Sequence, residues 1–365
     1  MTRGNQNKGL DEAQAIEGFI AAINSISNAN LGWRNADHGI KESFDALKFA
    51  FFQGDKRALQ DPSYVRECAF VGCGVRGKGP TGEELVSANS HVIANAASIT
   101  PLASESPRPH LKVLQPDLND VSNPKMRKVS PTEASTFIGY CRTHEDFYQV
   151  FEKQKKLTKA EHYMLQLTRS AAREVWKKEV FQESLDRIRE TYKEAVDLLH
   201  ISQQDKDDWN RKIQDPLDAL WFHAQGQKIR LHQIHLDLTA SIKAPELPEW
   251  VSQIEYDSTL KVALSGSTFL DHLPSIGPGA PSAPMLVITL VPNGDKTLLL
   301  MASSKDDARW VKLYEAQFLQ TPARRDCTIL AWMTATDHWF ANPEWWNHEL
   351  SEQSRKDILK RLSTV

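Results

Sequence analysis

Two cysteines that flank a glycine-bearing turn are the first residues of this sequence that could do chemistry. Cys68 and Cys73 are separated by four residues, and a Cys-x-x-His pair, Cys141 and His144, follows much later in the chain. Thiolate and imidazole are the usual ligands of a structural zinc ion, and four of them complete a tetrahedral site. The spacing therefore predicts a zinc site that joins two distant segments. The alternative is a set of ordinary buried thiols beside a surface histidine.

The glycine-rich run from Gly72 to Lys78 also matches most of a dinucleotide-binding loop and most of a phosphate loop. Both motifs need a helix directly after the glycines, because the helix N-terminus holds the phosphate. The following residues, GPTGEE, instead predict a turn, and Gly79 stands where a phosphate loop needs serine or threonine for magnesium. The sequence therefore favours a metal site over a nucleotide site.

A further candidate for chemistry, His91, lies in the sequence between the two predicted pairs of zinc ligands. It follows Ser90 and precedes the strand-like residues Val92 and Ile93. A neutral imidazole at the end of a short strand can act as a general base that takes a proton from water, which then attacks a phosphorus atom. A divalent ion nearby would stabilise the leaving oxygen. We therefore treat His91 as the candidate catalytic base.

The order of these motifs resembles that of bacterial HNH-like proteins with a treble-clef zinc site, most of which are uncharacterised. The resemblance rests on C-x4-C, SANSHVI and GYCRTHEDFYQVFE, and covers about residues 64–152. It implies a small zinc-stabilised ββα-metal domain in which His91 is the base. The zinc ligands that it implies are Cys68, Cys73, Cys141 and His144.

The same resemblance implies a second, catalytic ion such as Mg²⁺, with Asp146, or Glu145, at the start of the next helix as its best carboxylate ligand. The chain departs from the family pattern at Ser90, where many HNH enzymes carry an acidic residue or histidine. It departs again after His144, where a second histidine for the catalytic ion is missing. These departures keep open a non-catalytic, zinc-structured sensor or adaptor that binds other proteins.

The elements around these motifs predict an α+β protein with four segments. Residues 1–60 are expected to form a helical cap, and residues 61–155 the zinc-binding domain, which is irregular in sequence around short elements. Residues 156–245 carry apolar positions at heptad spacing, as in Leu185 and Ile188 or Leu217 and Leu220, and predict a long antiparallel helical hairpin of coiled-coil type. Residues 246–365 are expected to form a mixed α+β domain.

Strand-like runs dominate the last segment. Two of them, PMLVITLVP and KTLLLMASS, are joined by NGD, which predicts a hairpin. The apolar run CTILAWMT predicts a buried strand with Cys327 as an ordinary core residue. A nearby stretch, DHWFANPEWW, contains Asp337 and His338 but no nucleophile close in sequence, so aromatic packing is favoured there.

Composition limits the classes of function. The formal net charge of −3 over 365 residues gives no global attraction to nucleic acid, so any contact with DNA must come from local basic runs such as NPKMRK and EKQKKLTK. We find no apolar span long enough for a membrane, no leader, and too few cysteines for a disulfide framework, and we therefore expect a cytoplasmic protein. The expected function is an endonuclease in bacterial defence against foreign DNA, with a protein partner or a second copy engaged through the hairpin or the last domain.

Overall fold

The computed structural model describes residues 67–75, 90–103, 111–117, 124–197, 202–269, 285–336 and 338–362. The chain divides into two compact units, one of residues 59–176 and 230–365, which we call the sheet unit, and one of residues 1–58 and 177–229. The expected helical cap at residues 1–60 lies outside the described residues. Helices and strands are mixed along the rest, which confirms the α+β class.

Strands, long helices and short helical turns all occur in the described residues. The strands are β1 (Ser90–His91), β2 (Val113–Asp117), β3 (Lys125–Val129), β4 (Thr136–Phe137), β5 (Val251–Tyr256), β6 (Val262–Phe269), β7 (Met285–Asn293), β8 (Lys296–Ala302) and β9 (Trp339–Ala341). The longer helices are α4 (Arg142–Gln154), α5 (Ala160–Asp197), α6 (Gln203–Ala240), α7 (Ala308–Phe318), α8 (Pro322–Ala335) and α9 (Glu352–Leu362). The short helical turns are η1 (Asn95–Ile99), α3 (Thr100–Leu102), η3 (Lys305–Asp307) and η4 (Trp345–Glu349).

A seven-stranded antiparallel sheet with the order β3-β2-β9-β6-β7-β8-β5 is the centre of the sheet unit. The NGD hairpin is confirmed, because β7 and β8 pair up to Asn293 and Lys296, and Gly294 takes a φ of +74° that the tight turn requires. Strands β2 and β3 come from the expected zinc-binding segment, yet they extend the same sheet as strands from residues 251–341.

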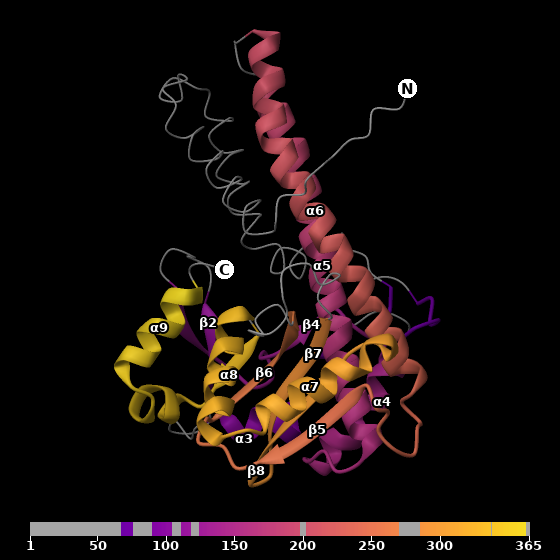
Figure 1. Ribbon diagram of the computed structural model, residues 1–365, viewed down its shortest axis with the longest axis vertical. Coiled ribbons are helices and arrows are strands. Elements are labelled where there is room, and N and C mark those ends of the chain that lie inside the picture. Colours follow the sequence, from indigo (N-terminus) through magenta and orange to yellow (C-terminus); the bar gives the residue numbers. More distant parts are fainter. Residues whose placement is uncertain are drawn as a thin grey trace. The chain divides into compact units, whose positions relative to one another are not determined.

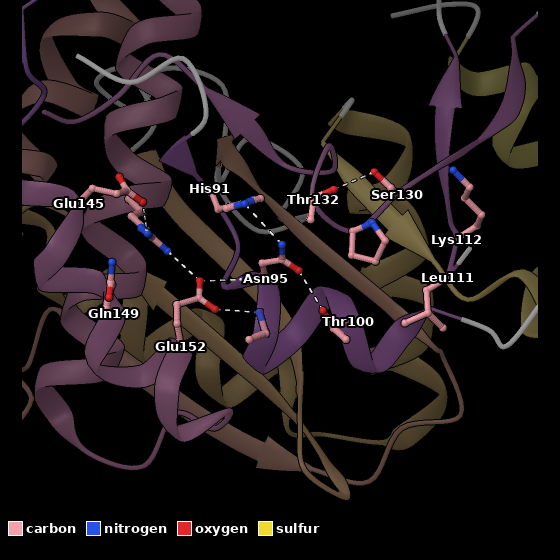
Figure 2. Close-up of a pocket in the computed structure, with 13 residues that line it drawn as sticks. His91, Asn95, Thr100, Leu111, Lys112, Ser130, Thr132, Glu145, Gln149 and Glu152 are labelled. Atoms are coloured by element: carbon pink, nitrogen blue, oxygen red, sulfur yellow. Dashed lines mark hydrogen bonds and ion pairs between the residues drawn. The ribbon is translucent and has the colours of Figure 1, made fainter. Parts of the chain in front are cut away.

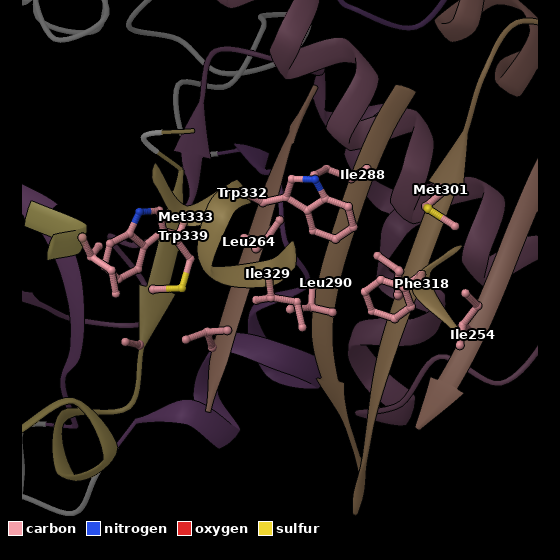
Figure 3. Packing of buried hydrophobic residues seen from close by; sticks show 14 of the residues in the cluster. Ile254, Leu264, Ile288, Leu290, Met301, Phe318, Ile329, Trp332, Met333 and Trp339 are labelled. Atoms are coloured by element: carbon pink, nitrogen blue, oxygen red, sulfur yellow. The ribbon is translucent and has the colours of Figure 1, made fainter. Parts of the chain in front are cut away.

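One face of this sheet packs against α7, α8 and α9 (Figure 1). Alternate strand residues such as Leu264, Ile288 and Leu290 point into this core, where Phe318 of α7 and Trp332 of α8 cover them (Figure 3). The rings of Phe318 and Trp332 stack with centroids 5.9 Å apart. Each such side chain contributes about 1.5–3 kcal/mol when it is fully buried, so this face is the main apolar core of the unit.

The structure corrects the expectation for residues 327–334, which form part of helix α8 rather than a buried strand. Thr321 caps this helix by accepting a hydrogen bond from the Arg324 backbone amide, and Pro322 occupies the first turn, where a missing N–H is harmless. Ile329 and Met333 are buried, whereas Cys327 is exposed. The prediction was wrong because the periodicity of a short apolar run does not distinguish a strand from a helix.

The first part of α5, residues 160–176, packs on the opposite face of the sheet and is buried from residue 162 onward. On the sheet side, the hydroxyls of Ser170 and Thr289 lie 2.6 Å apart. On its other side, Gln166 donates to the Val92 carbonyl at 2.7 Å and accepts from the Ala94 amide at 3.2 Å. This part of α5 therefore holds the segment that carries His91 in place against the sheet.

The described part of the other unit consists of the remainder of α5 and the first part of α6. Leu185 and Leu217, two residues of the expected apolar seam, are fully buried. Gln182 on α5 donates to Gln225 on α6 at 2.9 Å, and the indole N–H of Trp221 donates to Asp186 at 3.4 Å.

Among the helices that the structure describes, none combines the length and the apolar character that crossing a membrane would require.

A buried serine joins the His91 segment to strand β9. Ser135 has a φ of 61°, which is uncommon for a residue other than glycine, and its hydroxyl accepts from the Ile93 amide at 2.9 Å. The same hydroxyl lies 2.8 Å from Nε2 of His338. No nucleophile lies near His338 in the sequence. Folding alone brings the Ser135 hydroxyl to it. Both side chains are buried, so we assign them a structural role.

We expect Ser135→Ala to destabilise the protein by about 1–3 kcal/mol, because two buried polar groups lose their partner. Alanine keeps the backbone strain of this position, so the difference reports the hydroxyl alone. Thermal unfolding of the variant beside Thr328→Ala, which removes an exposed hydroxyl on α8, measures the effect. A shift no larger than that of the control would show that the Ser135 contacts contribute nothing.

Candidate metal centre and adjoining pocket

The four predicted zinc ligands lie together in the structure. One ligand atom each of Cys68, Cys73, Cys141 and His144 is within 4.8 Å of all the others, and the group could hold a metal ion. Tetrahedral zinc with bonds of about 2.3 Å to sulfur and 2.0–2.1 Å to nitrogen places sulfur atoms about 3.8 Å apart and sulfur and nitrogen about 3.5 Å apart. The structure has 3.8 Å between the Cys73 and Cys141 sulfurs, and 3.6 Å and 3.2 Å from His144 Nδ1 to the sulfurs of Cys68 and Cys141. These separations fit zinc.

The first pair of ligands is held by a tight turn. The Cys73 amide donates to the Phe70 carbonyl at 3.1 Å, and the Cys68 amide donates to Val75 at 2.8 Å. Gly72 and Gly74 have φ angles of +78° and +68°, in the left-handed region that glycine adopts without strain. The glycines that resemble a phosphate loop in the sequence therefore serve to fold the turn around the two cysteines.

The second pair of ligands is held by the start of helix α4. Cys141 directly precedes this helix, and His144 lies in its first turn with its amide 3.0 Å from the Cys141 carbonyl. The two pairs are tied together by the Cys141 amide, which donates to the Cys68 sulfur at 3.3 Å. Phe70 stacks on the His144 ring with centroids 4.0 Å apart, and so fixes the direction of its Nδ1.

Burial affects the protonation of these ligands. It raises the pKa of the Cys68 thiol to about 12 and lowers the pKa of His144. Zinc binds thiolate and neutral imidazole, so its binding releases the thiol protons and keeps the histidine neutral. Without an ion Cys68 would therefore stay a neutral thiol, and a dication has to compensate the buried thiolates for the protons to leave.

The four cysteines of the chain should differ sharply in reactivity. Zinc-bound thiolates are protected, whereas Cys327 is exposed on α8, so we expect one fast-reacting thiol per native chain and four after denaturation with a chelator. Titration with Ellman's reagent measures this, and Cys327→Ser should abolish the fast phase. Two or more fast thiols in the native, zinc-loaded protein would contradict the assignment.

Two short strands and α4 place His91 beside this centre. Strand β1 pairs antiparallel with β4, with His91 opposite Thr136, and β4 leads through Cys141 into α4. Nδ1 of His91 lies 3.1 Å from the Ala134 carbonyl, and Nε2 lies 3.5 Å from the Asn95 side-chain amide nitrogen. Because a carbonyl can only accept, Nδ1 carries the proton and Nε2 keeps its lone pair.

His91 is a neutral base in this position. Burial, and then the nearby charge of Arg169, lower its pKa from the ordinary value of 6.5. The neutral imidazole that general-base chemistry requires is therefore the dominant form at pH 7. The neutral ring and the hydrogen bond from Nδ1 to the Ala134 carbonyl leave Nε2 as the nitrogen that can accept a proton.

Nε2 faces a pocket of about 640 Å³ between α4, η1 and the turn after β3 (Figure 2). The lining residues are His91, Asn95, Ala96, Thr100, Leu111, Lys112, Ser130, Pro131, Thr132, Glu145, Gln149, Glu152 and Arg169. The charged side chains among them are two carboxylates and two cations. The pocket thus combines a general base with charged groups in one open space.

Of the two carboxylates that the sequence offered for a second metal ion, only Glu145 lines the pocket, and Asp146 does not. Asp146 is exposed on α4, where Gln149 donates to its carboxylate at 3.0 Å, and it does not line the pocket. Ser90 is buried and its hydroxyl accepts from the Tyr140 amide at 3.0 Å. Glu145, the alternative to Asp146, does line the pocket, together with Glu152.

Arg169, which no motif in the sequence singles out, engages both of these carboxylates. Its guanidinium is 2.5 Å from Glu145 Oε1 and 3.3 Å from Glu152 Oε1, and the side chain is only 2% exposed. It also lies over the Tyr148 ring, 4.1 Å from the centroid. The sequence gives no signal for this role, because the first part of α5 also carries Arg173 and Glu174 among its buried residues.

Glu152 has a further role that leaves it no free oxygen. Its Oε1 and Oε2 accept from the amides of Asn95 and Ala96 at 2.9 Å and 2.8 Å, at the start of η1. Arg169 also occupies the space between Glu145 and Glu152 that a metal ion bridging the two carboxylates would need. The residues of this pocket therefore do not fit a catalytic magnesium ion.

Comparison with protein-family models, curated proteins and solved structures finds no match to this chain. The resemblance to HNH-like proteins accordingly stays a prediction from the motifs. Function must therefore be inferred from the metal centre, from His91 and from the charges of the pocket.

Proposed function

We propose that this protein hydrolyses phosphodiester bonds in nucleic acid, with an HNH-like domain that zinc stabilises and with His91 as the general base. The observation that carries the proposal is the hydrogen bond between His91 Nδ1 and the Ala134 carbonyl. It fixes the ring with its unprotonated Nε2 toward the pocket, which is the arrangement that proton abstraction from water requires. Zinc at Cys68, Cys73, Cys141 and His144 would hold the turn, β4 and the start of α4 together.

The chemical step uses one water molecule. His91 Nε2 takes a proton from the water as its oxygen attacks phosphorus, the bond from phosphorus to one ester oxygen breaks, and the leaving oxygen takes a proton from solvent. The Asn95 side-chain nitrogen, 3.5 Å from Nε2, donates toward the same lone pair and has to give way to the water. Among the described residues, the chain provides no second histidine in this pocket that would protonate the leaving group.

Basic side chains next to the pocket support a polyanionic substrate. Lys112 lines the pocket, as does Ser130, which directly follows β3. Lys125, Arg127 and Lys128 are exposed on this strand. Charged residues on an edge strand also prevent pairing of that strand with the sheet edge of another molecule. A test must therefore distinguish phosphate binding from protection of the edge. Phosphate contacts would make binding steeply dependent on salt, whereas protection of an edge would not.

Cleavage assays test the proposal. Zinc-loaded protein is incubated with supercoiled plasmid and with labelled single-stranded DNA and RNA, beside His91→Ala. We expect cleavage of at least one substrate by the wild type and its loss in the variant. Equal cleavage by both proteins would remove His91 from the mechanism and point to a contaminating nuclease.

A second candidate is a non-catalytic, zinc-structured module that binds protein partners. The pairing of Arg169 with the pocket carboxylates favours it, because a catalytic ion has no place there. Exposed apolar residues on α6, Phe222 and Ile229 at 69% and 59%, would suit a partner on the proposed helical hairpin. A folded, zinc-loaded protein that cleaves none of the substrates would support this function.

The role in bacterial defence is implied by the motif resemblance alone.

A further inference from the structure

A cation of the protein itself, Arg169, pairs with both carboxylates of the pocket and offsets one of their two charges. Glu145 and Glu152 are seven residues apart on α4 and therefore lie on the same side of the helix, two turns apart. Both bind the guanidinium of Arg169, which reaches them from α5. Glu145 and Glu152 retain side-chain exposures of 24% and 18%, whereas Arg169 is almost completely buried. The fixed charge thus lies below the floor of the pocket.

Arg169 cannot leave this position easily. Its guanidinium lies between the two carboxylates and within 4.1 Å and 5.6 Å of the ring centroids of Tyr148 and Phe151. Buried guanidinium groups keep their charge at any accessible pH, and a planar fork suits two carboxylates. In the described part of the chain, Glu145 Oε2 is the single carboxylate oxygen of the pair without a hydrogen-bond partner.

We propose that Arg169 takes the place of a divalent cation between Glu145 and Glu152, so that this pocket binds neither Mg²⁺ nor Mn²⁺. The exclusion of the metal rests on the ion pairs alone and does not depend on the proposed function. The two carboxylates that could have recruited a metal ion are already engaged by the guanidinium.

Binding of Mn²⁺ tests the exclusion without any need for activity. Electron paramagnetic resonance follows free Mn²⁺ during titration of zinc-loaded wild type, Glu145→Gln, Arg169→Met and the double variant Arg169→Met/Glu145→Gln. Zinc content and circular dichroism show that each is folded. We expect no pocket site in the wild type, one site in Arg169→Met, where the two carboxylates lose their partner, and loss of that site in the double variant.

Two results would overturn the proposal. Mn²⁺ binding by the wild type that disappears in Glu145→Gln would show that Arg169 does not exclude a metal ion, and this comparison needs no Arg169 variant to fold. Folded Arg169→Met without a new Mn²⁺ site would show that Arg169 only bridges α5 and α4. Cleavage assays report separately on the proposed function, since these titrations are readable for an inactive protein.

Discussion

Replacement of Cys141 by serine is expected to abolish zinc binding and to destabilise the sheet unit by several kcal/mol. Structural zinc contributes about 10–16 kcal/mol of binding free energy in small zinc-folded domains, and the loss of one thiolate of four ligands removes a large part of it. Cys141 also connects β4 to α4, and its amide bonds to the Cys68 sulfur. The effect should therefore reach β1 and His91.

Zinc content by mass spectrometry and thermal unfolding measure this effect. Cys327→Ser is the matched control, because it changes the same residue type at an exposed site on α8 and should keep one zinc per chain and the wild-type unfolding temperature. A wild-type zinc content and stability in Cys141→Ser would show that Cys141 is not a ligand. Treatment of the wild type with a strong chelator should reproduce the effect of Cys141→Ser.

Replacement of His91 by alanine is expected to lower the rate of phosphodiester cleavage by about 10²–10⁴-fold, the usual contribution of a general base. Stability should change little by comparison, because the ring makes only one strong hydrogen bond, to the Ala134 carbonyl. His232→Ala removes an exposed histidine from α6 and serves as the control. A similar loss in both variants would indicate an indirect effect.

The pH dependence gives a second signature of His91. Its pKa lies below the ordinary 6.5, so the neutral, active form persists at mildly acidic pH. As the pH falls, cleavage should decline only below 6.5, where the imidazole gains a proton, and it should be flat across neutral pH. A rate that halves near pH 7 or above would assign the limiting titration to another group. The residual activity of His91→Ala should lack the acidic limb.

The cluster of three cysteines and one histidine could be predicted from the sequence because its chemistry is carried by residue type and spacing. Cysteine and histidine in C-x4-C and C-x2-H patterns are informative without knowledge of the fold. The β7–β8 hairpin was predictable for a similar reason, since the turn residues NGD determine it locally. In both cases the decisive residues are neighbours in the chain.

The pairing of Arg169 with Glu145 and Glu152 could not be predicted in this way. It depends on how α5 packs against α4, and the sequence contains no local pattern that specifies this packing. The same holds for β2 and β3, which join strands that are more than 100 residues away. Helix α8 was missed because its apolar face, with Ile329 and Met333, is embedded in a short run that also suits a strand.

X-ray absorption at the zinc edge of the purified protein is the most direct test of the central claim, that one tetrahedral ion joins the segments near residues 70 and 142. We predict one zinc per chain, with three sulfur atoms at about 2.3 Å and one nitrogen at about 2.0–2.1 Å. A protein that carries no zinc, or zinc in a shell of nitrogen and oxygen only, would contradict the claim and the site built on it.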